Sequence, residues 1–236
     1  MSGPEFAFAP PAQPSIEIVG GGLFPVRRIF CIGKNYADHV AEMGGDVKTS
    51  APVFFTKPAD AVVASGARVP FPPATDNLHF EGELVVAIGG AGRNLETRAD
   101  AGALIFGTAC GCDLTRRDLQ AAAKAKGEPW DAAKAFDRSA PVAPIGRSAD
   151  FPPADFDGAR LVTKINDEPR QNAPLSDMIL AVPEIICALS RLFELRPGDL
   201  VFTGTPAGVG PLKTGDKVRV EIGALPPLEF VMGEAR

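Results

Sequence analysis

The sequence predicts an α+β protein that is mainly β. Glycine and proline are both plentiful, with 25 and 23 residues spread along the chain, and this favours many short strands and turns over a helical bundle. Short apolar runs that stop at glycine or proline recur along the chain, whereas stretches of good helix formers are few. With 236 residues, 45% of them hydrophobic, the chain is expected to form one large domain, or one domain with a small N-terminal appendage.

The order of these runs gives the expected elements. Strands are expected over residues 26–33, 52–58, 84–88, 104–113, 161–165, 217–222 and 228–232. Helices are expected over residues 34–44, 96–103, 114–126 and 184–193, two of which stop at Gly44 and Gly127. Asn166 and Asp167 predict a turn. Residues 7–25 are rich in proline, so residues 1–25 are expected to form an extended arm.

Composition argues against several classes of partner. The formal charge is −5 and no basic block is present, so neither nucleic acid nor an anionic membrane is expected as the main partner. No apolar run approaches the length of a membrane span, and the N-terminus lacks the basic and apolar segments of a signal peptide. The four cysteines form no Cys-x-x-Cys pair, and most lie in apolar sequence. A reducing, cytoplasmic setting is therefore expected.

Two glutamates lead into the buried strand expected over 84–88. Glu81 and Glu83 are two residues apart, so on a strand their carboxylates point the same way. Two adjacent like charges are unfavourable unless something neutralises them, and oxygen ligands suit Mg²⁺, Ca²⁺ or Mn²⁺. The alternative is that both glutamates lie on a solvated strand end. Asp113 stands where the apolar run 104–112 ends, so its carboxylate is expected at the rim of the sheet.

A possible acid–base pair lies in the helix expected over 34–44. His39 and Glu42 are three residues apart and share a helix face, so the carboxylate can reach the imidazole and orient it as a base. The alternative is a surface ion pair. Residues 204–210 form a glycine-rich loop without the Gly-Lys-Ser/Thr of a P-loop, so nucleotide binding is not expected. A carboxylate-binding loop or a purely structural one fits better.

Several segments, taken in order, resemble the fumarylacetoacetate hydrolase family over about residues 28–232. They are 32–39 (IGKNYADH), 55–58 (FTKP), 81–83 (EGE), 113–120 (DLTRRDLQ), the stretch around Lys134, and 202–210 (FTGTPAGVG). Within the family, segments 7–11 (AFAPP), 57–63 (KPADAVV) and 135–141 (AFDRSAP) are most similar to the bacterial fumarylpyruvate hydrolases.

This resemblance implies a mixed β-sandwich roll and a homodimer. It implies a small N-terminal segment over 26–68 that carries a lid helix, and a catalytic domain over 69–236. It also implies Mg²⁺ or Mn²⁺ bound by the residues that match the family's ligands, Glu81, Glu83 and Asp113. Gly82 departs from the pattern, because the family often has a bulkier residue between the two glutamates.

The resemblance further implies a small 2-oxo acid substrate: a 3-acylpyruvate, specifically fumarylpyruvate, cleaved to fumarate and pyruvate in the breakdown of aromatic compounds. His39 and Glu42 would activate water. Lys134, a catalytic residue, would act with Arg117 and Gln120 on carboxylate and carbonyl oxygens, and Thr205 and Gly204 would hold the pyruvyl end. His79 is expected to have a structural role.

Three other functions stay open. Decarboxylation of oxaloacetate needs the same metal-stabilised enolate but no attacking water. Isomerisation of a 2-oxo-diene dioate needs the same base to move a proton. In a non-catalytic binding module, a metal at the three carboxylates would only stabilise the sheet.

Overall fold

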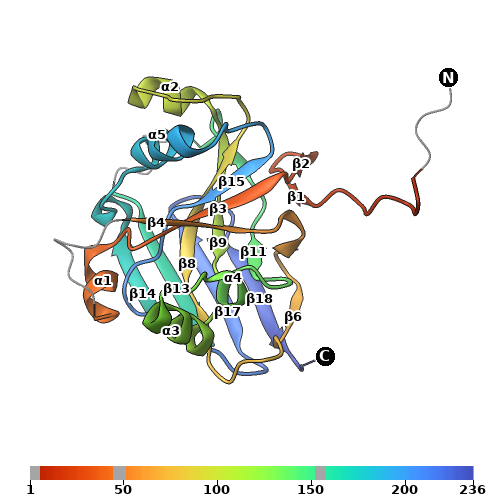
Figure 1. The fold of residues 1–236 in the computed structure, drawn as a ribbon, viewed down its shortest axis with the longest axis vertical. Helices are drawn as coiled ribbons and strands as arrows, with labels where there is room; N and C mark the ends of the chain where they lie inside the picture. Colours follow the sequence, from red (N-terminus) through yellow and green to blue (C-terminus); the bar gives the residue numbers. More distant parts are fainter. Residues whose placement is uncertain (1–5, 45–51, 152–157, 236) are drawn as a thin grey trace.

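The structure is a computed structural model, and it describes residues 6–44, 52–151 and 158–235 (Figure 1). Within them, two large β-sheets face each other. The eight-stranded sheet runs in the order β4 (Val53–Lys57), β3 (Arg28–Gly33), β15 (Asp199–Phe202), β8 (Gly82–Ile88), β9 (Ile105–Cys112), β11 (Ala140–Val142) and β5 (Val62–Ala64), with β12 (Gly146–Arg147) beside β9. The five-stranded sheet runs β14 (Glu168–Pro174), β13 (Arg160–Ile165), β17 (Lys217–Ile222), β18 (Leu228–Gly233) and β6 (Arg68–Pro70).

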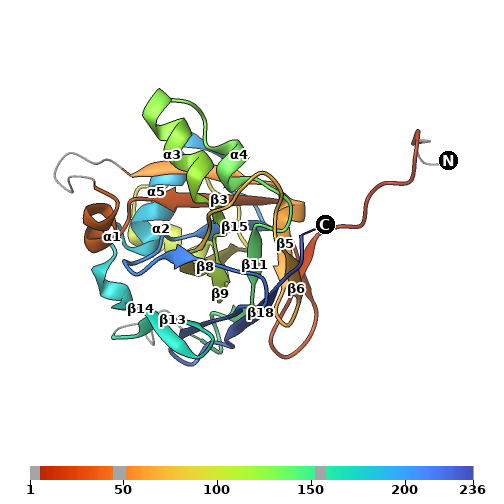
Figure 2. The same ribbon diagram turned by 90° about the horizontal axis from the view of Figure 1, so that it is seen from below.

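Two smaller sheets and the helices complete the described part of the chain. The three-stranded sheet holds β10 (Thr115–Arg116), β7 (Leu78–Phe80) and β16 (Gly210–Pro211), and the two-stranded one holds β1 (Ser15–Glu17) and β2 (Leu23–Pro25). The α-helices are α1 (Ala37–Glu42), α2 (Arg98–Ala103), α3 (Arg117–Lys126), α4 (Asp131–Lys134) and α5 (Val182–Leu192). Short 3₁₀ helices cover Ala59–Ala61 and Leu175–Asp177. Figure 2 shows α3 next to α4, on the opposite side of the molecule from β13 and β18.

Strand β8 lies near the middle of the large sheet and is buried along its whole length. Alternate residues face different parts of the core, as expected for a strand. Leu84 packs between the two large sheets, whereas Val85 packs against the opposite layer, which includes the β1–β2 hairpin. Strand β15 lies between β3 and β8, parallel to β3 and antiparallel to β8. The mainly β sandwich predicted from the sequence is confirmed.

The N-terminal segment differs from the extended arm expected over 1–25. Residues 15–25 form the β1–β2 hairpin, and Ile16, Ile18 and Phe24 are buried in the core. Glycines 20–22, all with positive φ, form the turn. The prolines misled the prediction because most of them precede the hairpin, and Pro25 is the last residue of β2 and does not interrupt the strand. Of the expected arm, the described residues 6–14 lie outside this hairpin. Within them, Phe6 and Phe8 are exposed.

The helix expected over 114–126 begins later. Thr115 and Arg116 pair with His79 and Leu78 as strand β10, so α3 starts only at Arg117. The turn expected at Asn166 and Asp167 is present, and both residues adopt positive φ, as a tight hairpin turn requires. Among the described residues, no helix is both long enough and apolar enough to cross a membrane. The domain boundary expected at residue 68 stays a prediction, although β3 and β4 belong to the same sheet as β8.

Candidate metal centre

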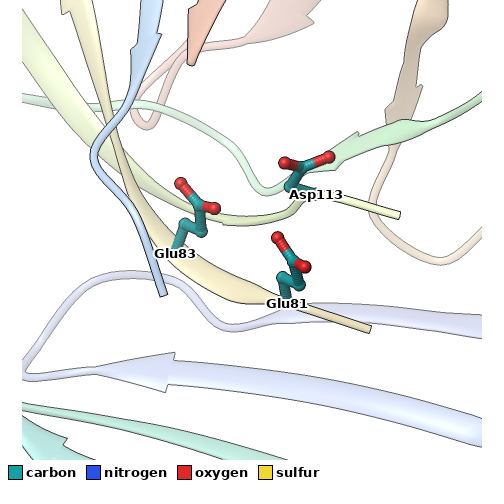
Figure 3. A group of neighbouring side chains, drawn as sticks. All are labelled: Glu81, Glu83 and Asp113. Atoms are coloured by element: carbon teal, nitrogen blue, oxygen red, sulfur yellow. The ribbon is translucent and has the colours of Figure 1, made fainter. Parts of the chain in front are cut away.

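Three carboxylates meet at the end of strands β8 and β9 (Figure 3). Glu81 lies in the single-residue gap between β7 and β8, Glu83 lies on β8, and Asp113 follows β9. One oxygen from each lies within 4.8 Å of the others. Their exposed fractions are 5%, 2% and 1%, so these charges are removed from water. The three residues that the family resemblance implied as metal ligands therefore lie together in the structure.

Strand pairing brings the three carboxylates together. Gly82 pairs with Cys112, and the Asp113 amide donates to the Glu81 carbonyl at 2.8 Å, which continues the antiparallel ladder to the site. The apolar residues of both strands fix this register, since a slip by one residue would turn the whole buried set to the wrong face. Side chains that end an apolar strand are thus held at the rim of a rigid sheet.

Gly82 is required by close packing of the second sheet. A Cβ atom at this position would overlap the Thr163 hydroxyl of β13 and lie 3.1 Å from the Gln171 amide oxygen of β14. The Gly82 amide donates to that Gln171 oxygen at 2.9 Å, and its carbonyl accepts from the Thr205 hydroxyl at 2.8 Å. The departure from the family pattern therefore brings the second sheet against the backbone that carries both glutamates.

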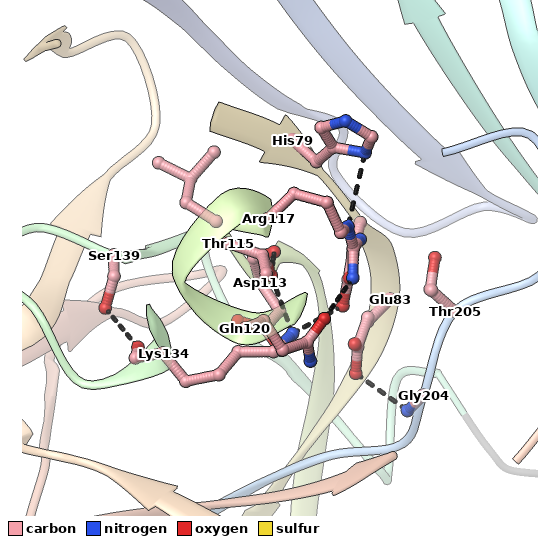
Figure 4. A network of polar contacts seen from close by, with 12 residues as sticks. His79, Glu83, Asp113, Thr115, Arg117, Gln120, Lys134, Ser139, Gly204 and Thr205 are labelled. Atoms are coloured by element: carbon pink, nitrogen blue, oxygen red, sulfur yellow. Dashed lines mark hydrogen bonds and ion pairs between the residues drawn. The ribbon is translucent and has the colours of Figure 1, made fainter. Parts of the chain in front are cut away.

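Lys134 connects two of the carboxylates (Figure 4). Its ammonium donates to Glu81 Oε2 at 2.7 Å and to Asp113 Oδ2 at 2.7 Å. A third hydrogen bond goes to Thr115 Oγ1 at 2.6 Å, which uses every donor that an ammonium has. Burial would lower the pKa of Lys134, but Asp113 and Glu81 raise it above its ordinary value. Lys134 is therefore a cation in this structure.

Arg117 holds Glu81 from the other side. It donates through Nη2 to Glu81 and through Nη1 to Gln120 Oε1 at 2.5 Å. Its Nε lies 3.4 Å from His79 Nδ1, and His79 Nε2 lies 2.9 Å from Asn77 Oδ1. Burial first and Arg117 second lower the pKa of His79 to about 4, so the neutral ring accepts from Arg117 and donates to Asn77. His79 therefore orients Arg117, consistent with the structural role expected for it.

Glu83 has no cation within ion-pairing distance among the described residues. Its Oε2 accepts from the Gly204 amide at 2.7 Å. Burial raises its pKa, and the Asp113 and Glu81 carboxylates raise it further. For Glu81, by contrast, burial is outweighed by Lys134 and Arg117, which hold its pKa below the usual range. A hard cation among these oxygens would supply the charge that Glu83 lacks, so the donor set fits Mg²⁺ or Mn²⁺.

Helix α1 carries the pair predicted from the i, i+3 spacing. His39 Nδ1 lies 3.0 Å from Glu42 Oε2. Glu42 Oε1 accepts from the Gly208 amide at 3.0 Å, which ties the helix to the glycine-rich loop. The His39 side chain is 11% exposed, but that of Glu42 is 34% exposed. The imidazole thus faces inward while its carboxylate partner contacts solvent.

A cavity of about 300 Å³ joins these groups. It is lined by the three carboxylates and by most of the residues predicted to act on substrate, namely His39, Arg117, Gln120, Lys134 and Thr205. Glu42 and Gly204 do not line it. Gly204 instead donates its amide to Glu83, and the Thr205 hydroxyl accepts from Gln171 Nε2 at 2.7 Å. A small molecule in this cavity would contact carboxylates, cations and an imidazole at once.

A model of the fumarylacetoacetate hydrolase C-terminal domain matches residues 28–232. The chain belongs to the fumarylacetoacetate hydrolase family. It is an enzyme of this family, and the members that are similar to this chain include a hydrolase, a tautomerase and an isomerase.

Three relatives show the range of these activities. Mouse mitochondrial oxaloacetate tautomerase FAHD1 is 41% identical over 86% of this chain and 90% of its own. Fumarylpyruvate hydrolase from Pseudomonas aeruginosa, solved with Mn²⁺ and pyruvate, is 42% identical with a TM-score of 0.94, over 98% of this chain and all of the other. A 2-hydroxyhepta-2,4-diene-1,7-dioate isomerase from Mycobacterium marinum is 34% identical with a TM-score of 0.76, over 90% of this chain and 77% of its own.

One buried residue beside the carboxylates was missed by reasoning from the sequence. Lys57, the last residue of β4, is buried and lies 2.8 Å from Asp113 Oδ1. Its ammonium also donates to the backbone carbonyls of Leu114, at 3.2 Å, and Lys134. The sequence did contain a signal for this contact, namely a lysine at the end of an apolar strand. A lysine is almost never fully buried unless it pairs with a carboxylate, so a buried partner could have been predicted. Lys57 therefore holds one oxygen of Asp113, and Lys134 holds the other.

Proposed function

We propose that the protein is a divalent-metal-dependent hydrolase that cleaves fumarylpyruvate, a 3-acylpyruvate, to fumarate and pyruvate. The match to the Pseudomonas aeruginosa fumarylpyruvate hydrolase supports this proposal, because that enzyme has the same fold over nearly the whole chain, with a TM-score of 0.94 and 42% identity, and was solved with Mn²⁺ and pyruvate. Water adds to the acyl carbonyl, and the bond between that carbon and C3 of the pyruvyl group then breaks. A proton on C3 completes pyruvate.

Glu81, Glu83 and Asp113 would hold the cation. When bound, Mg²⁺ or Mn²⁺ supplies Lewis-acid stabilisation of the negative charge on the departing pyruvate enolate, which is worth several kcal/mol. Lys57 and Lys134 keep Asp113 in place from two sides, at 2.8 and 2.7 Å. Gly204 fixes one oxygen of Glu83. This leaves the other Glu83 oxygen without a hydrogen-bond partner in the described structure.

His39 would take the proton from the attacking water. Its Nδ1 contacts Glu42, so its Nε2 is the nitrogen available to the substrate. Glu42 would orient the ring and stabilise the imidazolium that forms, and the Gly208 amide holds Glu42 in turn. General base assistance of this kind contributes about 10²–10⁴-fold to the rate.

Lys134, Arg117 and Gln120 would bind the oxygens of the substrate. Every ammonium donor of Lys134 is used in the structure, so Lys134 reaches the acyl carbonyl only by releasing one of its present acceptors. Arg117 and Gln120 lie one helical turn apart at the start of α3, where both line the cavity. Thr205 and the backbone at Gly204 would hold the pyruvyl end.

Turnover with defined substrates tests the proposal. Purified protein is assayed with fumarylpyruvate, acetylpyruvate and oxaloacetate at saturating Mg²⁺ or Mn²⁺, and again with excess chelator. We expect fumarylpyruvate to be cleaved fastest, with products identified as fumarate and pyruvate, and activity to be lost in chelator. Full activity in chelator would contradict the metal assignment, and an absence of fumarylpyruvate cleavage would contradict the substrate assignment.

Oxaloacetate tautomerisation is the second candidate, supported by the 41% identity to the mouse tautomerase. This reaction moves a proton between C3 and the enol oxygen of oxaloacetate and needs no attacking water. His39 could serve as its base in the same cavity. Following the loss of the enol absorbance of oxaloacetate, beside pyruvate release, separates tautomerisation from the decarboxylation considered earlier. Because the Mycobacterium marinum relative is an isomerase, 2-oxo-diene isomerisation is a further reaction to assay.

The proposed reaction belongs to the breakdown of aromatic compounds in the cytoplasm, and we propose a homodimer as the active assembly. Light scattering at micromolar concentration tests the assembly directly. A mass that matches one chain of 24.7 kDa would contradict the dimer.

A further inference from the structure

Two lysines that no step above uses line the outer part of the cavity. Lys34 follows β3, and Lys124 lies in the second half of α3. Both line the metal-centre cavity, and both also line an adjoining cavity of about 670 Å³. The two cavities share these lysines with Phe55, Trp130 and Lys134, so the lysines stand at the junction.

Neither lysine is neutralised within the described part of the chain. Lys57, Lys134 and Arg117 all pair with carboxylates, whereas neither Lys34 nor Lys124 has a carboxylate of the described residues within 4.0 Å. All three cations line the same cavity, and burial first, then repulsion from Lys34 and Arg117, lower the pKa of Lys124, whereas Glu81 raises it. An anion between Lys34 and Lys124 would relieve this repulsion.

The backbone at Lys34 is held firmly. Lys34 has a φ of 65°, a conformation that is uncommon for a residue with a side chain. The next residue, Asn35, is buried, and its amide group donates to the carbonyls of Thr203 at 2.8 Å and Leu180 at 3.0 Å. Lys124 is carried by the ten-residue helix α3, whose first turn holds Arg117 against Glu81. Both lysines therefore start from anchored backbone.

The wall shared by the two cavities is aromatic. The Phe55 and Trp130 rings are in contact, with centroids 5.9 Å apart. A flat, unsaturated carbon chain suits such a wall, and a carboxylate suits the two lysines beside it. The metal centre, with Arg117, offers charges for a 2-oxo acid at the inner end. The cavity therefore combines the charged groups of the metal centre with an aromatic wall and two further cations.

We infer that Lys34 and Lys124 bind a second carboxylate at the far end of the substrate, so that the enzyme selects 2-oxo dicarboxylic acids over 2-oxo monocarboxylic acids. This inference rests on the proposed function for its choice of substrate. Within that function it explains how fumarylpyruvate is distinguished from acetylpyruvate, since only the former has a carboxylate on its acyl group.

Binding of two unreactive acids tests the inference without turnover. 2-Oxoheptanedioate and 2-oxoheptanoate both have seven carbons, as fumarylpyruvate does, and differ in the distal carboxylate. Neither has a second carbonyl in the 4-position, so neither can undergo the proposed cleavage. Calorimetry with saturating Mg²⁺ is expected to show about 10-fold tighter binding of the diacid, the order of one charge-assisted hydrogen bond. Equal affinities would overturn the inference.

Variants then assign the preference to the lysines. Lys124→Met is expected to reduce the preference for the diacid over the monoacid to less than about 3-fold. Lys124→Arg is expected to retain most of that preference. Lys34→Asn tests the second cation, because asparagine tolerates the positive φ. Lys126→Met is the matched control: it removes a charge from the same helix, but Lys126 does not line either cavity. An unchanged preference in both Lys124→Met and Lys34→Asn would overturn the inference, as would an equal loss in the control.

The two proposals fail in different ways. If the parent protein does not cleave fumarylpyruvate but prefers the diacid through Lys124, the hydrolase proposal fails and the carboxylate subsite stands. If it cleaves fumarylpyruvate and acetylpyruvate equally well, and binds the two seven-carbon acids equally, the subsite fails and the hydrolase proposal stands.

Discussion

The metal centre and helix α1 are built in contrasting ways, although they face the same cavity. The metal centre is anchored on paired strands, and its carboxylates are at most 5% exposed. Helix α1 has six residues, of which Val40 is the buried one, and Glu42 is 34% exposed. The carboxylates proposed to bind the metal are thus fixed by the sheets, whereas His39, which is proposed to take a proton from water, lies on a short surface helix.

This difference assigns different kinds of work to the two regions. Buried charges need their partners in place before the substrate arrives, because rearranging them inside a protein is costly. A base on a short helix can instead approach when the substrate binds and then exclude bulk water. The Gly208 contact to Glu42 links the two regions, since Gly208 belongs to the same glycine-rich loop as Gly204, which donates its amide to Glu83.

The largest effect is expected from breaking the metal centre. Glu83→Gln keeps the shape of the side chain but removes the charge that lacks a cation partner, so Mg²⁺ or Mn²⁺ affinity should fall and kcat should drop at least about 10³-fold, in line with the several kcal/mol that a catalytic metal supplies. Metal titration by calorimetry, beside turnover, checks this. Glu96→Gln, an exposed glutamate outside the cavity, is the control. Normal metal affinity in Glu83→Gln would show that the ligand assignment is wrong.

The next effect comes from the helix side. His39→Ala should lower kcat on fumarylpyruvate by about 10²–10⁴-fold while the metal affinity changes little, because strands β8 and β9 position the carboxylates. Any decarboxylation of oxaloacetate should fall far less, since no proton is removed from water there. Kinetics on both substrates with saturating Mg²⁺ provide the measurement. An equal fall in the two activities would mean that α1 serves closure alone.

Packing behind the metal centre is tested by Gly82→Ala. The added methyl group overlaps the Thr163 hydroxyl, so we expect a loss of about 1–3 kcal/mol in the free energy of unfolding. Denaturant unfolding measures it. The double variant with Thr163→Ala should recover part of the loss, because it removes the overlapping oxygen. A stability equal to that of the parent in Gly82→Ala alone would contradict the close approach.

The smallest effect is expected on the pH dependence of stability and comes from His79, which accepts a hydrogen bond from Arg117. The pKa of His79 is lowered to about 4, so the folded protein binds fewer protons at this ring than the unfolded chain between about pH 4 and 6.5. The contribution of neutral His79 to the free energy of unfolding is therefore present near pH 7 and is lost as the pH falls from about 6.5 to about 4. Because the ring is about half-buried, we expect only about 1–2 kcal/mol. His79→Gln should flatten the pH dependence of unfolding between pH 7 and 4 by that amount, and an unchanged slope would refute it.

Much of the fold was predictable because local pattern and final structure agree. The apolar runs that became β8 and β9 are buried on both faces, and the alternation in β17 matches its buried and exposed residues. The His39–Glu42 contact follows from helix geometry alone. By contrast, the β1–β2 hairpin is stabilised by Ile16 and Phe24 in the distant core, which no local pattern shows.

The remaining features of the site depend on pairing between distant segments. Strand β10 forms because Thr115 and Arg116 pair with β7, and this overrides their place in a helix-like stretch. Lys57 reaches Asp113 across 56 positions of sequence because β4 and the end of β9 face the same cavity. Glu-x-Glu spacing predicted two carboxylates on one face. It could not predict that one of them pairs with Lys134 and Arg117 while the other is left with a backbone amide.

The position of β15 between β3 and β8 determines when the enzyme can acquire its active form. As the chain leaves the ribosome, β3 and β4 on one side and β8 and β9 on the other lack the strand that joins them until Phe202 has been made. The Gly204 amide that holds Glu83 emerges later still. Contacts of such long sequence separation form slowly. Nascent chains that end before residue 199 should therefore stay protease-sensitive and bind no metal, and the growing polypeptide completes its binding site only near the end of synthesis.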